Sequence, residues 1–185
     1  MEFSKLHRVC REESELEKCK TVLFTHYERI KNIFQYYIGT SSYPTISMND
    51  FTSFSTKCGI LDGKYINLST LDRTLITTNV ALHSYTSSAE RDLQRYEFLE
   101  IIVRLANTRY KDTHMVDNVG DGVDRFLHEL IYPNAKSVDG NTFRKYHCYN
   151  MKVNELLKKN ELVLRKMYES FTHSKKKYVT LQEIQ

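Results

Sequence analysis

Three polar segments of the chain each end in an acidic residue that opens the next apolar stretch. The three acids are Asp50, Glu97 and Glu183. Proteins bind calcium in twelve-residue loops that supply oxygens from positions one, three, five and seven and a bidentate carboxylate from position twelve. Aligned on an apolar residue at position eight, the three loops are 39–50 with Ile46, 86–97 with Leu93 and 172–183 with Val179. The first question is therefore whether these loops bind calcium.

The ligand positions of the first loop predict that it does not. Positions one, three and five are Gly39, Ser41 and Tyr43, and none of them supplies a carboxylate. Position six, where a calcium loop turns with a positive φ, is Pro44. Proline fixes φ near −65° and cannot make that turn.

The third loop is predicted to be inactive because of its positive charge. Its first, third and fifth positions are Thr172, Ser174 and Lys176. Together with Lys175 and Lys177, three ammonium groups occupy the place where a dication would sit. The carboxylate of Glu183 alone does not compensate for them.

The second loop keeps enough oxygens to be considered as a weak calcium site. It offers the side chains of Thr86, Ser88, Glu90 and Glu97 and the carbonyl of Asp92, but Arg91 replaces the glycine at position six. The alternative for all three acids is structural, because a carboxylate near the start of a helix caps free N–H groups and favours the helix dipole. We expect this structural role for Asp50, Glu97 and Glu183, and we predict no metal site.

Residues suited to catalysis are present, but their spacing assembles no known active site. Seven histidines are scattered along the chain: His7, His26, His83, His114, His128, His147 and His173. They form no His-x-x-x-His or His-Glu-x-x-His motif, and the chain has no glycine-rich phosphate loop and no Gly-x-Ser-x-Gly. The neighbours His147 and Cys148 would point about 100° apart on a helix, and Gly120-Asp-Gly122 is expected to start or kink a helix. We predict no enzyme, no catalytic residue and no cofactor.

The composition is that of a globular, helical protein. Hydrophobic residues make up 41% of the 185 residues, and six glycines and two prolines are few for the turns of a β-sandwich or barrel. The cysteines Cys10, Cys19, Cys58 and Cys148 are widely spaced, which favours free thiols in a reducing, cytosolic compartment. The N-terminal segment lacks the apolar run of a signal peptide or a membrane span.

Apolar residues at three- and four-residue intervals predict helices along most of the chain. The predicted helices cover residues 13–37, 47–58, 69–82, 95–110, 115–131, 142–149 and 153–171. No stretch reads as a convincing strand, so we predict an all-α fold in one or two lobes, 1–110 and 111–185. The last helix has an apolar face that we expect to pack against this domain or against a partner. This face consists of Leu156, Leu157, Leu162, Leu164, Met167 and Tyr168.

The repeated pattern of helix, polar loop, apolar residue, acid and helix resembles the EF-hand (calmodulin-like) superfamily over residues 14–110 and 153–185. Phe51 and Phe98 follow position twelve, as is usual for the exiting helix of that superfamily, and Ile184 takes this place in the third loop. More narrowly, Arg95-Tyr-Glu-Phe-Leu-Glu-Ile-Ile-Val-Arg-Leu-Ala106 and Asn141-Thr-Phe-Arg144 are similar in style to EF-hand-like proteins of cilia and flagella. The resemblance implies degenerate EF-hand-type helix–loop–helix units, paired in the first lobe and incomplete at the end, and a structural role in the axoneme. It also implies that the apolar residue at position eight of one loop pairs with that of its partner loop.

The expected function is that of a non-catalytic adaptor that binds other proteins independently of calcium, in a ciliary axoneme or another microtubule assembly. The lysine-rich last third of the chain would steer it toward an acidic partner such as tubulin. Two alternatives remain, a weak calcium sensor acting through residues 86–97 and a nucleic-acid-binding protein. Nucleic acid ranks last, because the lysine-rich face has no interleaved aromatic residues and no known motif. We expect no membrane partner and a cytoplasmic location on the cytoskeleton, in the cilium or flagellum.

Overall fold

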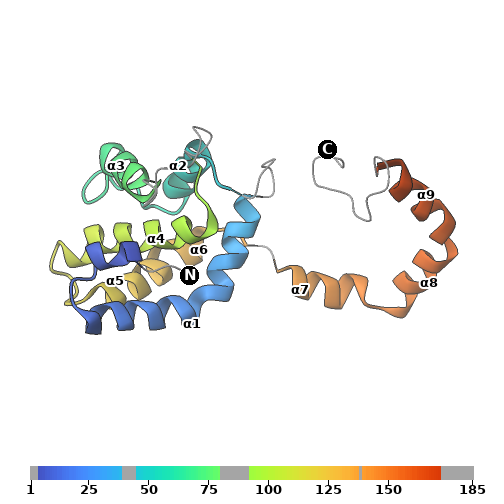
Figure 1. Cartoon of the computed structure of the whole chain (residues 1–185), viewed down its shortest axis with the longest axis horizontal. Coiled ribbons are helices and arrows are strands. Elements are labelled where there is room, and N and C mark those ends of the chain that lie inside the picture. Colours follow the sequence, from blue (N-terminus) through green and yellow to red (C-terminus); the bar gives the residue numbers. More distant parts are fainter. Residues whose placement is uncertain (1–3, 39–44, 80–91, 138, 172–185) are drawn as a thin grey trace. The chain divides into compact units, whose positions relative to one another are not determined.

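A computed structural model describes residues 4–38, 45–79, 92–137 and 139–171. Within these ranges every regular element is a helix (Figure 1), and the only extended pairing is one isolated bridge. The predicted all-α class is therefore confirmed for the described part of the chain. The predicted loop residues 39–44, 86–91 and 172–183 lie outside the described residues.

The predicted helices are observed, with changes at their ends. In chain order the elements are η1 (Ser4–Arg8), α1 (Glu13–Tyr37), α2 (Met48–Lys57), α3 (Leu68–Asn79), α4 (Arg95–Ala106), η2 (Asn107–Lys111), α5 (Val119–Phe126), η3 (Leu127–Ile131), α6 (Tyr132–Asn134), α7 (Gly140–Phe143), η4 (Arg144–Cys148), α8 (Met151–Lys159) and α9 (Glu161–Phe171). η1 is a 3-10 helix, whereas η2, η3 and η4 are π-helical turns. α1 has the predicted bounds.

The chain divides into two compact units, residues 1–138 and 139–185. The sequence analysis predicted a division after residue 110, and the difference comes from α5. This helix packs against both α1 and α4, and it contributes Val119, Val123 and Phe126 to the buried core. A helix assigned from the sequence to the second lobe therefore completes the core of the first.

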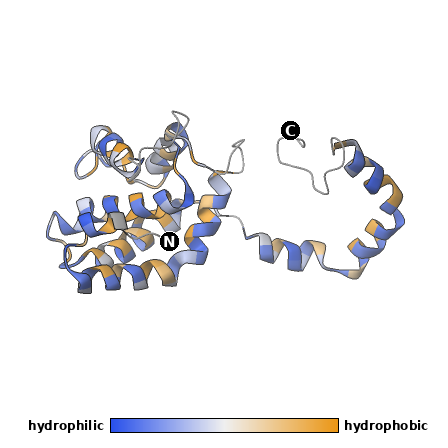
Figure 2. Ribbon diagram, viewed as in Figure 1, coloured by the Kyte–Doolittle hydropathy of each residue, from blue (hydrophilic) through white to orange (hydrophobic). Residues whose placement is uncertain are grey.

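Aromatic side chains from three helices meet in the core of the first unit. The ring centroid of Phe98 in α4 lies 5.5 Å from that of Phe34 in α1 and 5.6 Å from that of Phe54 in α2. Tilted and edge-to-face pairs at such distances are favourable beyond the area that they bury. Figure 2 shows apolar and polar residues alternating along α1, α4 and α5, as amphipathic helices require.

Glycines at the start of α5 let this helix approach α1 closely. A Cβ atom on Gly120 would lie only 3.0 Å from Cγ of Lys18. The segment Gly120-Asp-Gly122 occupies the first turn of α5, which the side chain of Asn118 caps. The expectation that this segment starts a helix is confirmed, and the helix predicted from residue 115 begins at Val119.

Two π-helical turns contact each other beyond α4 and α5. The predicted helix 95–110 leaves α-helical geometry after Ala106 and continues as η2. Tyr110 of η2 is buried, and its hydroxyl donates a hydrogen bond of 2.7 Å to the carboxylate of Glu129 in η3. Burial and this hydrogen bond raise the pKa of Tyr110 to about 12. A π turn inserts one extra residue into a helix, so a search for a 3.6-residue period does not predict it.

The second unit is a succession of short helices with no buried side chain in its described part. The helix predicted over 153–171 is divided at Asn160, whose side-chain amide donates to the carbonyl of Leu156 at 2.8 Å. The apolar residues predicted for this helix all remain exposed: Leu156, Leu157, Leu162, Leu164, Met167 and Tyr168. The unit therefore does not bury this face itself.

Asp62 organises the turn that follows α2. Its Oδ1 accepts hydrogen bonds from the backbone N–H groups of Lys64, Tyr65 and Ile66 at 3.0, 2.8 and 3.0 Å, and its Oδ2 pairs with Arg109 at 2.6 Å. Burial alone would raise the pKa of Asp62, but the three backbone donors and the guanidinium outweigh it. The pKa therefore lies below its ordinary value.

Replacing Asp62 by alanine is expected to lower the free energy of unfolding by about 2 kcal/mol, because one charged acceptor serves several donors. For Asp62→Asn the deficit relative to the wild type should be full at neutral pH. It should vanish as the pH falls through the depressed pKa of Asp62, because a protonated carboxyl no longer favours the folded state. Urea unfolding between neutral pH and about pH 2 measures this.

The matched control is Asp72→Asn in α3. No hydrogen bond or ion pair of the Asp72 side chain is found in the described residues, so its change should stay within about 0.5 kcal/mol at every pH. An equal loss in the two asparagine variants would contradict the role of Asp62.

Candidate functional site

A one-residue antiparallel bridge between Ile46 and Leu93 joins the ends of the first two predicted loops. The N–H of Ile46 donates to the carbonyl of Leu93 at 2.9 Å, and the N–H of Leu93 donates to the carbonyl of Ile46 at 2.8 Å. Both side chains are buried. Beside them, the Thr45 hydroxyl donates to the carboxylate of Asp92 at 3.0 Å. The pairing that the alignment predicts for the two residues at position eight is therefore present.

Two of the three loop acids stabilise helix starts. The side-chain oxygen of Ser47 accepts from the N–H of Asp50 at 3.2 Å, and its hydroxyl donates to the Asp50 carboxylate at 2.7 Å. The Glu97 carboxylate accepts from the N–H of Gln94 at 2.9 Å. Glu97 thus caps a backbone N–H as expected, whereas the Asp50 carboxylate accepts from the hydroxyl of Ser47, which is itself the N-terminal cap of α2. Glu183 lies outside the described residues.

Most other predicted ligand residues also lie outside the described part of the chain. They are Gly39, Ser41, Tyr43, Thr86, Ser88, Glu90, Thr172, Ser174 and Lys176. The residues expected to prevent calcium binding, Pro44, Arg91 and Lys175 to Lys177, lie there as well. The absence of calcium binding by these loops therefore stays a prediction from the sequence.

An apolar groove of about 620 Å³ opens between α1 and α4 in the first unit. Its apolar lining comes from Leu23, Phe24, Tyr27, Tyr96 and Leu99. Phe24 is 87% exposed, which is unusual for a phenylalanine beside a concave surface. Arg95 adds a positive charge to the lining, and no ion pair of its guanidinium is found among the described residues.

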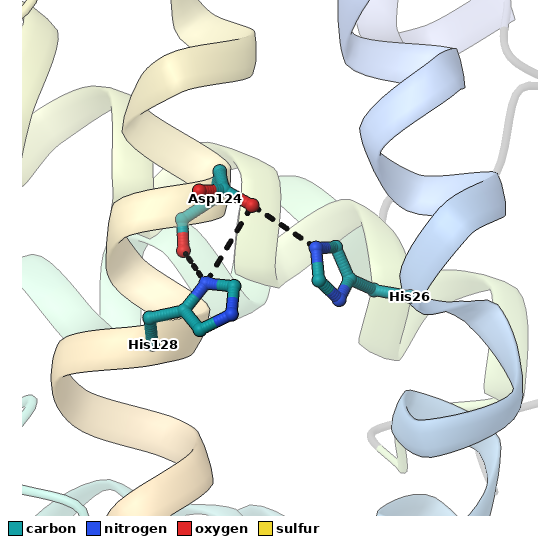
Figure 3. Close-up of side chains that lie close together, drawn as sticks. All are labelled: His26, Asp124 and His128. Carbon is teal, nitrogen blue, oxygen red and sulfur yellow. Dashed lines mark hydrogen bonds and ion pairs between the residues drawn. The ribbon is translucent and has the colours of Figure 1, made fainter.

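Three side chains that could ligate a metal meet where α1 packs against α5. His26 projects from α1, Asp124 from α5 and His128 from η3, and they point toward one another (Figure 3). Nε2 of His26 lies 3.0 Å from Oδ1 of Asp124, and Nδ1 of His128 lies 3.5 Å from the same oxygen. The three potential ligand atoms all lie within 4.8 Å of one another. The spacing of the histidines alone did not predict this cluster. The four-residue spacing of Asp124 and His128 along one helical segment was the available indication.

We interpret this cluster as a hydrogen-bonded link between helices. Nδ1 of His128 also lies 2.9 Å from the backbone carbonyl of Asp124. Because a carbonyl only accepts, Nδ1 carries the proton and is not free to bind a metal. Both imidazoles pack against the ring of Tyr132, and the guanidinium of Arg29 lies 3.6 Å from the centroid of that ring. This fixed positive charge beside the cluster disfavours a second cation.

The cysteines differ in burial, since Cys10, Cys19 and Cys58 are buried and Cys148 is half-buried. All four cysteines are free. Cys10 and Cys19 are buried and in contact, and the hydrogen bond to Cys10 together with burial raises the pKa of the Cys19 thiol. In the second unit, His147 packs against Phe143 with ring centroids 5.3 Å apart. These contacts are those of packed side chains.

Comparisons with known proteins give this chain no relative. No family model matches it, and neither the curated proteins nor the solved structures contain a significant match. Among the described residues, no helix is long and apolar enough to cross a membrane. The function therefore has to be argued from the residues and their geometry.

Replacing Asp124 by alanine is expected to lower the free energy of unfolding by about 1 kcal/mol, because Nε2 of His26 loses its hydrogen-bond partner, whereas Nδ1 of His128 keeps the backbone carbonyl of residue 124. Adding zinc should leave the unfolding midpoint of the wild type unchanged. Asp117→Ala is the control, since no hydrogen bond or ion pair of Asp117 is found in the described residues, and it should change stability by less than about 0.5 kcal/mol. A zinc-dependent rise in the unfolding midpoint of the wild type that is absent in Asp124→Ala would contradict this interpretation. It would show that the cluster is a metal site.

Proposed function

We propose that the protein is a non-catalytic adaptor whose first unit is a pair of degenerate EF-hand-type helix–loop–helix units, and which binds another protein without needing calcium. The observation that carries the proposal is the bridge between Ile46 and Leu93. It joins the position-eight residues of two loops that lie between α1 and α2 and between α3 and α4. This is the pairing that the resemblance implies for two such units.

The contacts around the bridge support independence from calcium. A carboxylate at position twelve would have to turn toward an ion, but the Glu97 carboxylate accepts from the N–H of Gln94. The carboxylate of Asp50 accepts from Ser47 in the equivalent place. The two loop acids that the structure describes, Asp50 and Glu97, are therefore engaged locally, beside the bridge.

The groove between α1 and α4 is the binding surface that fits this role best. The exposed ring of Phe24 offers an apolar contact, and Arg95 offers a positive charge beside it. This combination fits an amphipathic helix with acidic residues along its edge, because charge complementarity fixes the register of an apolar contact. An acidic partner also agrees with the net charge of +4. Tubulin is the acidic partner expected from the sequence. Microtubules are therefore the first assembly on which to test the proposed binding.

The whole chain is expected to co-sediment with microtubules to the same extent in EGTA and in millimolar calcium. The double variant Phe24→Ser/Arg95→Gln should pellet several-fold less, because it removes the apolar and the charged contact together. The measurement is the fraction of protein pelleted against tubulin concentration.

The matched control is Ile76→Ser/Lys57→Gln, which removes an exposed apolar residue and an exposed cation from α3 and α2, away from the groove. It should pellet like the wild type. Protein that stays in the supernatant would contradict the microtubule partner, and pelleting in calcium alone would favour the calcium-sensor alternative.

A further inference from the structure

A second concavity of the first unit, of about 810 Å³, is lined mainly by cationic and hydroxyl side chains. It forms where the end of η1, the side of α3 and the junction of α4 with η2 come together. Its cations are Arg8, Arg11, Arg73, Arg104 and Lys111. It shares no lining residue with the groove between α1 and α4.

Three of these five cations have no acidic partner among the described residues. Arg104 pairs with Glu100 and Lys111 with Glu15. In the described residues, however, no ion pair is found for Arg8, Arg11 or Arg73. The guanidinium of Arg73 uses only its Nε, in a long contact of 3.4 Å with the backbone carbonyl of Ser69. Like charges that share a concave wall repel one another, and an anionic ligand would relieve that repulsion.

Two acidic residues, Asp112 and Asp117, also line the wall but do not neutralise it. The carboxylate of Asp112 accepts from the side-chain amide of Asn107 at 3.0 Å. Asp117 also lines a smaller neighbouring hollow that includes Glu15. Arg11 and Lys111 line that hollow as well, but five cations against two acids still leave the lining of the larger pocket with a net positive charge.

Irregular backbone also lies at this pocket. Asn107, Thr108 and Lys111, three of the five residues of the π-helical turn η2, line it. His114 lines it too and has φ of 57°, the only positive φ of a residue other than glycine in the described chain. π turns and left-handed residues of this kind are costly and cluster at functional sites. These backbone features are independent of the charges of the lining, and they also indicate a functional site at this pocket.

The hydroxyl side chains of α3 indicate what else the ligand would present. Thr74 donates its hydroxyl proton to the carbonyl of Thr70, and Thr77 donates to that of Arg73. Both hydroxyl protons are therefore already engaged, and the two hydroxyl oxygens remain as hydrogen-bond acceptors toward a ligand in the pocket. The wall suits a polar body with hydroxyl or amino donors that also carries strong negative charge.

We propose that this pocket binds a compact ligand bearing two or more phosphate groups. A planar guanidinium donates two parallel hydrogen bonds to a phosphate, which favours three unpaired arginines as its receptors. The volume lies in the range of about 300–1,000 Å³ that small-molecule sites occupy. An acidic peptide would spread its carboxylates along a surface, so the concave wall favours the compact polyanion.

The test uses inorganic tripolyphosphate as the probe and isothermal titration of the full chain at low salt. The wild type should bind at one site, and the affinity should fall steeply when the salt is raised, because binding releases counterions. Arg11→Gln/Arg73→Gln should weaken binding by about tenfold or more, the loss expected from two charge-assisted contacts.

The control Lys57→Gln/Arg165→Gln also removes two positive charges, but neither residue lines the pocket. It should bind within about twofold of the wild type, since all five cations that line the pocket remain. Circular dichroism checks that both variants keep their helical content. Phe24→Ser/Arg95→Gln should also bind normally, so this proposal and the adaptor proposal fail separately.

Three results would overturn the proposal. The first is no binding of tripolyphosphate at low salt. The second is an equal loss in the pocket variant and in the charge-matched control, which would mean unspecific attraction. The third is a polyglutamate peptide that binds more tightly than tripolyphosphate and displaces it, which would assign the pocket to an acidic segment of a protein.

Discussion

Two backbone hydrogen bonds between Ile46 and Leu93 tie together segments that are far apart in the sequence. Each residue immediately precedes the capping residue of a helix, Ser47 for α2 and Gln94 for α4. The bridge therefore fixes where these two helices begin relative to each other. Consistent with this, Phe51 and Phe98, at equivalent places in the two helices, lie with ring centroids 6.2 Å apart. The aromatic core follows from this one pairing.

Local capping replaces the work that an ion would do at such a pairing. An ion in a loop of this type draws the helix-start carboxylate toward itself. In this chain the carboxylates of Asp50 and Glu97 accept from groups three residues before them, which stabilises each helix start separately. The bridge can then be held by buried apolar contacts alone. This is the physical basis of the proposed calcium-independent adaptor.

Local periodicity predicted the helices well, because it reports which face of a helix is buried. The bounds of α1, the start of α2 beside Ser47 and the pairing of Ile46 with Leu93 were all available from the sequence. The place of α5 was not, because its packing on α1 depends on a close approach at Gly120 that no local pattern reports. The π turns were not predicted for a related reason, since their extra residue breaks the 3.6-residue period.

The side-chain groupings formed between distant segments were the least predictable features. His26 meets Asp124 and His128 only because α1 and α5 pack together. The cationic pocket likewise needs Arg11, Arg73 and Lys111, which come from distant parts of the chain. Residue types alone gave no signal for either, because scattered histidines and arginines usually lie on a solvated surface. Tertiary packing created both groupings.

Hydrogen exchange at the amides of Ile46 and Leu93, followed by NMR, tests the central claim most directly. The account predicts that both amides are strongly protected and that their exchange rates are the same in EGTA and in millimolar calcium. Protection that appears only with calcium would contradict it, because the bridge would then depend on a bound ion. Rapid exchange of both amides in either condition would show that the loops are not paired at all.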